Sequence, residues 1–422
     1  MTGRATGRTS LGSMTRWLLS LCMLPALVAA CPGTETREVP LYDPYVGPEV
    51  FPTRRAKLPA VVGDLGLVSN TGSDTITAID VAQGKVLATV PVGKNPVDID
   101  GTHHVAVDRG RGFAYAAFSY PPSTTATGPH ASHGSSTRLG LVQKLRLEDL
   151  AVVGEVRVDP NPGDIVLSDD GKRLVVTHFD LARATSADAG TGDRRATIAL
   201  IDPEKILAVG SPEPVKIAVC PAPHGVALSR PTGDVAYVSC YGADAIAVVD
   251  LTKPSATPTL VKLGGAAQAA PLPAIYGPYS AILSPSGAEL VVASTESKDV
   301  RFLDVATRTF TNRVFDTKGA PFFPAWAPDE SVLYVPTQLP DGVRVIDPKT
   351  GQSRSERAFT ASECQRPHEA VLGTDPSTVW IVCEGDRKAP SVVLGLDRDT
   401  LATRVTFPVG VYPDRLILGR PR

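Results

Sequence analysis

The chain has 422 residues, of which 43 % are hydrophobic and 6 % aromatic, with 37 glycines and 38 prolines. This composition is sufficient for a hydrophobic core and typical of a chain with frequent turns, so it excludes long helices as the main element. The formal charge of -2, from 42 basic and 44 acidic residues, provides no polybasic surface and excludes nucleic acid as the expected partner.

Residues 1–30 have the order of a bacterial export signal, with three arginines followed by an apolar stretch. The stretch is too short to span a membrane as a mature helix. It ends in VAAC at residues 28–31, which is similar to a lipobox whose cysteine receives a diacylglyceryl group. We therefore expect a lipoprotein signal peptide over residues 1–30 and lipidation of Cys31. The alternative is an ordinary secretory signal cleaved at an Ala-x-Ala-like site.

Residues 31–60, rich in proline and charge, are predicted to form a tether.

A short strand that ends in a small or polar residue recurs seven times from Leu67 onwards. The seven tetrads are LVSN, YAAF, VVTH, YVSC, VVAS, YVPT and WIVC. In most repeats a proline precedes the tetrad by thirteen residues, and a strand ending in Ile, Val or Leu followed by Asp comes after it. Such a period indicates a supersecondary unit that is stacked against copies of itself, here with four antiparallel strands.

The two ends of the repeat region complement each other. The first tetrad lacks a preceding strand, whereas residues 412–418 (YPDRLIL) form a first strand without a repeat of its own. Joining them would remove the exposed sheet edges. We therefore predict an all-β fold over residues 61–422, a seven-bladed β-propeller of four-stranded antiparallel blades that is closed when the C-terminal strand joins the N-terminal blade.

The aspartates that end the third strands are predicted to be structural, because a carboxylate at this place accepts backbone N–H groups of the following turn. These residues are Asp80, Asp202, Asp250, Asp304, Asp347 and Asp397.

The stretch LVSNTGSDTITAIDVAQGKVLATVPVGKNP, residues 67–96, resembles the repeat of the YVTN family of bacterial β-propellers. It has the tetrad, the Ile-Asp strand end and the Val-Gly-x-x-Pro exit, and weaker copies extend the resemblance from about residue 61 to 419. The resemblance implies an exported or surface-anchored propeller, related in shape to lactonase-like propellers and to the haem-binding propeller of some nitrite reductases. Activity does not transfer with the fold. This chain departs from the repeat in the last tetrad residue at Phe118, His178, Cys240 and Cys383, and in insertions near residues 121–138 and 182–195.

Four cysteines form two matching sets, each a Cys-x-x-Pro-His sequence followed by a cysteine that ends a tetrad. In an oxidising compartment this pattern predicts the disulfides Cys220–Cys240 and Cys364–Cys383, each stabilising by roughly 3 kcal/mol in the loop-entropy model. A simple hairpin register places Cys240 opposite about His224, so the segment before it must fold back. The alternative is a metal site formed twice by Cys-x-x-x-His and a second cysteine.

The histidines are the main functional signal. Six of the seven are predicted to map to one face of the propeller, namely His103, His130, His133, His178, His224 and His368. The thirteen-residue spacing gives three of them one shared inner-strand position at the channel mouth, which other copies fill with Tyr279, Phe322 and Asp414. The three are His103, His224 and His368. For His103, counting from Pro96 would instead place Val97 there.

Neutral imidazoles around one mouth suit a transition metal, with His178, His224 and His368 as the candidate ligands. With Arg366 and Arg415 they also suit an anionic ligand. The structural alternative is that each histidine hydrogen-bonds to a neighbouring blade.

Several catalytic signatures are absent from the sequence: Cys-x-x-Cys-His, a phosphate-binding Gly-rich loop, Gly-x-Ser-x-Gly and His-Glu-x-x-His. We therefore expect a monomeric, lipid-anchored binding or scaffold module without a cofactor, whose channel mouth faces an envelope protein, peptide or glycan. The alternative is a metal- or haem-associated redox accessory or a lactonase-like hydrolase that uses the mouth histidines. Because Pro32 rather than an inner-membrane retention Asp follows Cys31, the outer membrane is the favoured location, on its periplasmic or surface side.

Overall fold

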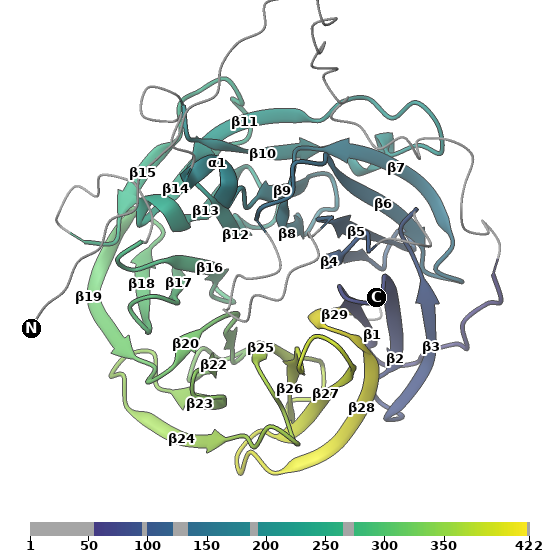
Figure 1. Cartoon of the computed structure of the whole chain (residues 1–422). Helices are drawn as coiled ribbons and strands as arrows, with labels where there is room; N and C mark the ends of the chain where they lie inside the picture. Colours follow the sequence, from purple (N-terminus) through teal and green to yellow (C-terminus); the bar gives the residue numbers. More distant parts are fainter. Residues whose placement is uncertain (1–54, 95–98, 121–133, 186–192, 265–273, 420–422) are drawn as a thin grey trace, which may run out of the picture. The chain divides into compact units, whose positions relative to one another are not determined.

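The computed structural model describes residues 55–94, 99–120, 134–185, 193–264 and 274–419. Seven antiparallel sheets stand around one axis as the blades of a propeller (Figure 1). This arrangement confirms the predicted all-β, seven-bladed fold. The predicted signal peptide, Cys31 and the tether up to residue 54 lie outside the described residues.

The blades are numbered in chain order from the one that contains β1, and each is given from its inner to its outer strand. Blade 1 contains β29 (Pro413–Gly419), β1 (Leu65–Asn70), β2 (Thr75–Asp80) and β3 (Lys85–Pro91). Blade 2 contains β4 (Thr102–Asp108), β5 (Phe113–Phe118), β6 (Gly140–Arg146) and β7 (Val152–Val158). Blade 3 contains β8 (Pro162–Leu167), β9 (Leu174–His178), β10 (Ala196–Ile201) and β11 (Val215–Cys220). Blade 4 contains β12 (Pro223–Leu228), β13 (Val235–Cys240), β14 (Ala245–Asp250) and β15 (Thr259–Lys262).

The remaining blades follow the same order. Blade 5 contains β16 (Pro278–Leu283), β17 (Glu289–Ser294), β18 (Asp299–Asp304) and β19 (Thr309–Asp316). Blade 6 contains β20 (Ala320–Pro321) and β21 (Ala325–Trp326), then β22 (Leu333–Gln338), β23 (Gly342–Ile346) and β24 (Ser353–Ala358). Blade 7 contains β25 (Pro367–Leu372), β26 (Thr378–Cys383), β27 (Pro390–Asp397) and β28 (Thr403–Val411).

Burial falls from the axis outwards. The tetrad strands are buried along nearly their whole length because each is covered on both faces by neighbouring blades, as in β1 and β26. Outer strands such as β24 alternate between half-buried and exposed residues. The core therefore consists of apolar layers between adjacent blades, for example Leu67 and Ile76 of blade 1 with Phe118 of blade 2.

The turns after the third strands have the predicted chemistry. In each of the six turns the carboxylate of the strand-ending aspartate accepts a hydrogen bond from a backbone N–H two or three residues later. The structural role predicted for these aspartates is confirmed. The donors are the N–H groups of Gln83, Glu204, Thr252, Thr307, Lys349 and Asp399.

Closure occurs as predicted, by the last strand of the chain. β29 pairs antiparallel with β1, from Leu65 opposite Gly419 onwards, and the yellow and purple strands lie side by side in Figure 1. Leu416 of β29 is buried in a cluster with Val68 and Trp380. Arg109 also donates to the backbone carbonyl of Gly419. Both ends of the repeat region are thus required to complete blade 1.

The inner strand of blade 6 is broken into β20 and β21, and both pieces pair with β22. The interruption is Phe322-Phe323-Pro324, where Pro324 has no N–H for the ladder. Phe323 forms instead a parallel bridge to Glu369 in blade 7. The break thereby moves Phe323 away from its own sheet.

In the part of the chain that the structure describes, helical structure is limited to short connections: α1 (Leu181–Thr185) and the 3-10 turns η2 (Pro203–Lys205) and η3 (Tyr241–Ala243). Among the described residues, no helix has the length and apolar character needed to cross a membrane.

Deletion of residues 412–422 should abolish the cooperative thermal transition, because it exposes the edge of β1 and removes the buried Leu416 side chain. The truncation of one buried leucine alone costs about 2–5 kcal/mol. Circular dichroism melting checks this, with a deletion of residues 420–422 as the control that leaves β29 intact. Equal melting of both truncated proteins would show that β29 does not close the ring.

Candidate functional site

The inner strands begin at equivalent positions in all seven blades. In six blades the first residue of the inner strand faces the last tetrad residue, as in Pro223 with Cys240 and Thr102 with Phe118, and in blade 6 the second residue of β20, Pro321, faces Thr337. The residue that follows is defined here as the first channel layer. Its members are His103, Gly163, His224, Tyr279, Phe322, His368 and Asp414. The registers thus give His103 the position predicted from the spacing.

A β-bulge lies at this point in six of the seven inner strands. In β16 and β25, for example, the pairing steps over Tyr279 and His368, so these residues have no partner in the ladder. A bulge changes the direction in which side chains point, so two successive residues of the strand take part in channel contacts. The second of them is defined here as the second channel layer: His104, Asp164, Gly225, Ser280, Phe323, Glu369 and Arg415.

Side chains from opposite blades meet in the channel. The ring of Phe323 lies 5.3 Å from the ring of His104, 6.0 Å from that of His224 and 5.3 Å from that of His368. The His224 ring stacks on Tyr279 at 3.7 Å. The centre of the channel is therefore filled by aromatic rings and imidazoles.

Asp414 of β29 lies between histidines of two other blades. Nδ1 of His103 contacts its Oδ2, and Nδ1 of His368 lies 3.2 Å from its Oδ1 and donates to its backbone carbonyl at 2.7 Å. Nε2 of His368 faces Oε1 of Glu384 at 3.9 Å. All four side chains are at most 2 % exposed. Closure of the ring by β29 therefore brings a carboxylate to two imidazoles.

The second channel layer contains a charged network. His104 donates from Nδ1 to Oδ1 of Asp164 at 2.9 Å, and Nη1 of Arg415 lies 3.3 Å from the same oxygen. Arg415 also lies 3.6 Å from Glu369 and above the Phe323 ring. One arginine thus compensates two buried carboxylates.

The pKa values follow from burial and from these pairs. Burial raises the pKa of Asp414, but His103 and His368 outweigh it and hold this pKa well below its usual range. Burial and the neighbouring His103 lower the pKa of His104 to about 3, so its imidazole is neutral at pH 7. Burial raises the pKa of Glu369 to about 7, against the opposing effect of Arg415.

Not all predicted site residues join this group. His178 is buried at the end of β9, where its Nδ1 donates to the Thr197 carbonyl at 2.8 Å. Arg366 precedes β25 at the rim and donates to the Gly385 carbonyl. His130 and His133 lie outside the described residues. The predicted ligand set of His178, His224 and His368 does not form one ligand group among the described residues; the groups that do form are His103, His104 and Asp414, and His368, Glu384 and Asp414.

The two predicted disulfides are present, Cys220–Cys240 and Cys364–Cys383. The register difficulty is resolved because Cys220 ends the outer strand of blade 3, whereas Cys240 ends the tetrad strand of blade 4. Cys364 likewise lies between blades 6 and 7, and Cys383 ends the tetrad strand of blade 7. Each disulfide therefore fixes the passage from one blade to the next.

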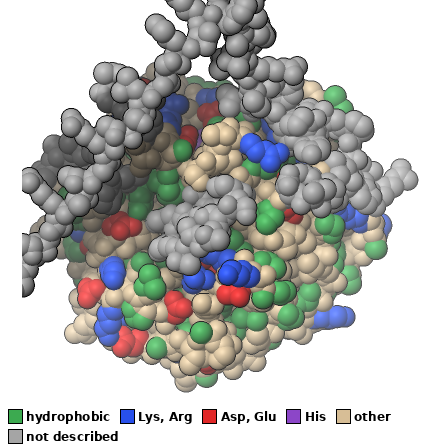
Figure 2. Space-filling view, viewed as in Figure 1, with side chains coloured by type: hydrophobic (Ala, Val, Ile, Leu, Met, Phe, Trp, Pro, Cys, Tyr) green, Lys and Arg blue, Asp and Glu red, His purple; other side chains and the backbone are tan. Residues whose placement is uncertain are grey.

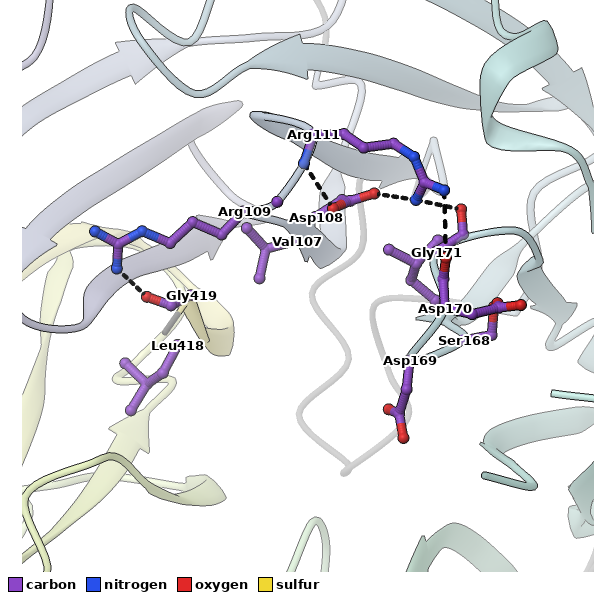
Figure 3. A pocket seen from close by; sticks show the side chains of 12 residues that line it. Val107, Asp108, Arg109, Arg111, Ser168, Asp169, Asp170, Gly171, Leu418 and Gly419 are labelled. Carbon is purple, nitrogen blue, oxygen red and sulfur yellow. Dashed lines mark hydrogen bonds and ion pairs between the residues drawn. The ribbon is translucent and has the colours of Figure 1, made fainter. Parts of the chain in front are cut away.

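Two cavities open at the opposite end of the inner strands. One of about 320 Å³ lies between the ends of β4, β8 and β29 (Figure 3). Its arginines bind backbone: Arg109 donates to Gly419, and Arg111 donates to Gly171 while pairing with Asp108. The other, of about 230 Å³, reaches Arg415. Both arginines of the first cavity are thus engaged in contacts that link neighbouring blades.

Sequence reasoning missed His104, Asp164, Glu369 and Glu384. The first three are the second residues at the bulges. In a regular strand the side chains alternate between the two faces, and this alternation would place these three residues against the neighbouring blade. Aligning the six Pro-x-x segments with Thr102-His103-His104 of blade 2 would have found them, since four of the seven copies place an acidic or basic residue there. Glu384 directly follows a tetrad, and its proximity to His368 arises only in the folded blade.

No family model matches the chain. No curated protein matches it either. Among solved structures, it is similar to the periplasmic gluconolactonase PpgL of Pseudomonas aeruginosa, with 17 % identity and a TM-score of 0.60 over 85 % of this chain and 100 % of that one. A functionally unknown protein from Desulfotomaculum acetoxidans has 13 % identity and a TM-score of 0.58 over 85 % and 99 %. The dihydro-heme d1 dehydrogenase NirN, solved with DHE, has 16 % identity and a TM-score of 0.52 over 86 % and 68 %. These likenesses establish a fold like those propellers and say nothing about activity.

The buried His178 should make stability fall with acidity. Burial lowers its pKa from 6.5 to about 4, with Asp159 opposing and Lys216 reinforcing this shift. Above pH 6.5 the imidazole is neutral in both states; between pH 6.5 and 4 only the unfolded chain takes up the proton, so stability decreases by roughly 3 kcal/mol. Urea unfolding from pH 7 to 4 should therefore show a shallower loss for His178→Asn than for the wild type. If the free energy of unfolding falls with pH to the same extent in both proteins, the interpretation of His178 as a neutral buried imidazole is contradicted.

Proposed function

We propose that this protein is a lipid-anchored β-propeller of the bacterial cell envelope that acts as a binding or scaffold module through the histidine end of its channel. The observation that carries the proposal is the convergence of His103, His368 and Asp414 from three blades at one end of the channel. Structural cores seldom place so many buried polar groups at one point, because each must be compensated. The partner we propose is an envelope protein, peptide or glycan.

The envelope location has two lines of support. The order of charge and apolar residues before Cys31 is that of a lipoprotein signal. The disulfides Cys220–Cys240 and Cys364–Cys383 are typical of an oxidising compartment. We also infer membership of the YVTN family from the repeat at residues 67–96, with the outer membrane as the site of anchoring.

The rim of the histidine end supplies the groups that a partner would touch. Arg366 is half-buried there, next to the first-layer residue His368. Figure 2 shows basic and acidic side chains interspersed on the face in view, without a large patch of a single charge sign. A half-buried arginine is the residue type that most often dominates a contact with a partner.

A lactonase-like hydrolase is the second candidate. A histidine that contacts a carboxylate, as His103 contacts Asp414, is a pair that can act in general-base catalysis. PpgL, which is described as a gluconolactonase, has a similar fold. A haem-associated role is less well supported, because a haem in the channel would have to displace the rings of Phe323, Tyr279 and His224.

Replacement of Cys31 should release the protein from the membrane. In a bacterial host, the wild type should sediment with membranes and need detergent for extraction, whereas Cys31→Ala should not carry lipid. Fractionation and metabolic labelling with a fatty acid check this. Cys22→Ala is the matched control, since Cys22 lies within the predicted signal and its loss should leave the label unchanged. Equal labelling of Cys31→Ala and the wild type would remove the anchor from the proposal.

Replacement of Arg366 should weaken capture of the envelope partner. Immobilised wild type and Arg366→Ala are compared for retention of solubilised envelope components, and we expect a loss of at least about fivefold, the effect of a hot-spot arginine. Arg230→Ala is the matched control, because Arg230 is exposed beyond β12 at the opposite end of the channel.

Equal retention by both variants would contradict binding at the histidine end. Hydrolysis of gluconolactone by the purified protein, lost in His103→Ala, would replace the binding module by the second candidate.

A further inference from the structure

The strongest unassigned feature is a group of buried nitrogen and carboxylate ligands around Asp414. It is defined here as the Asp414 cluster and consists of His103, His104, His368, Glu384 and Asp414. Two sets of three, which share Asp414, each offer ligand atoms that all lie within 4.8 Å of one another. Every member is buried. This is the donor spacing from which a small cation can be coordinated with minor side-chain movement.

Two polar atoms of the cluster have no hydrogen-bond partner although they are buried. They are Nε2 of His104 and Oδ1 of Asp414, the second of which has Nδ1 of His368 at 3.2 Å as an ion-pair neighbour but not as a hydrogen-bond donor. A buried imidazole nitrogen or carboxylate oxygen that is left unsatisfied costs about 1–3 kcal/mol or more. Both are acceptor atoms in the neutral imidazole and the ionised carboxylate, so they need a donor or a cation.

The His104 side chain is oriented as metal-ligating histidines are. Its Nδ1 donates to Asp164, which itself accepts from the backbone N–H groups of Ile165 and Val226. A carboxylate that holds one ring nitrogen fixes the tautomer and leaves the other nitrogen free to ligate. Asp164 therefore acts as a positioning residue behind His104.

His368 and Glu384 present a second pair of acceptors. In the neutral imidazole, donation from Nδ1 of His368 to the Asp414 carbonyl leaves a lone pair on Nε2, which faces Oε1 of Glu384 at 3.9 Å. That separation is too long for a hydrogen bond. Oε1 of Glu384 already accepts a hydrogen bond from Nε2 of Gln338 at 3.1 Å and keeps a further lone pair. Two ligands bound at roughly 2.0–2.2 Å to one ion lie about 3–4 Å apart, so an ion between Nε2 of His368 and Oε1 of Glu384 would bind both.

We propose that the Asp414 cluster binds one divalent transition-metal ion of the zinc or copper class. Imidazole and carboxylate donors suit these ions, whereas Ca²⁺ and Mg²⁺ prefer sites made of oxygen alone. The channel cysteines supply no thiolate, because they form disulfides. The ion would also offset the negative charge of the carboxylates of Asp414 and Glu384, of which Glu384 is paired with Arg387. This inference rests on the proposed function, since it names the ligand held at the histidine end of the channel.

The test is Zn²⁺ binding by the purified full-length protein after removal of metal with a chelator. Calorimetric titration should give about one equivalent, and His104→Gln should weaken the affinity at least about 100-fold, the upper range for loss of a supporting group. His178→Gln is the matched control: it also removes a buried histidine at the end of a channel-side strand, but His178 binds Thr197 and lies outside the cluster. Its affinity should equal that of the wild type.

The Co²⁺ form gives a readout that needs no variant. Visible d–d absorption bands should appear in the wild type at one equivalent of Co²⁺ and disappear on addition of Zn²⁺. A wild type that binds Ca²⁺ alone, or that binds neither Zn²⁺ nor Co²⁺, overturns the proposal even if His104→Gln does not fold. Wild-type binding of Zn²⁺ that is unchanged in a folded His104→Gln overturns it as well.

The two proposals fail separately. Protein that captures its envelope partner in an Arg366-dependent manner but binds no Zn²⁺ retains the proposed function and loses the metal. Protein that binds one Zn²⁺ but shows equal capture by Arg366→Ala and Arg230→Ala loses the proposed binding face and retains the metal.

Discussion

The pairing of β29 with β1 is the constraint on which the rest of the molecule depends. It completes blade 1, and it also brings Asp414 and Arg415 into the channel beside residues of blades 2, 3 and 7. The ring and the candidate site are therefore assembled by the same hydrogen-bonded ladder. A change that weakens the ladder would disturb the site even though no channel residue is altered.

The channel shows how a repeat fold obtains a unique centre. The same strand position is occupied by imidazole, phenol, phenyl or carboxylate in different blades, so the sequence differences between repeats converge on one axis. The rings of His224, Tyr279 and Phe323 form an aromatic plug at the centre of the channel. Burial in this plug gives the polar groups their shifted pKa values, because water is replaced by rings.

The fold could be predicted almost completely from the sequence, since tetrads, prolines and the unpaired C-terminal strand are local signals with a fixed period. The shared position of His103, His224 and His368 followed from the same spacing. The second layer could not be predicted, because a β-bulge shifts His104 by one residue relative to the alternation of a regular strand. His178 was grouped with the others by its place at a strand end, yet its ring lies against Thr197 of the next strand. The break at Pro324 that frees Phe323 is likewise a tertiary effect.

The disulfides have a consequence for the order of events during synthesis. The bonded cysteines are only 20 and 19 residues apart, so each bond requires no more than the start of one blade to have emerged from the ribosome or the export channel. Neighbouring blades 3 and 4 can thus be locked together early, and blades 6 and 7 somewhat later. Asp414, by contrast, follows blades 2 to 7 in chain order, so a nascent chain can be oxidised and largely stacked before its channel acquires this carboxylate.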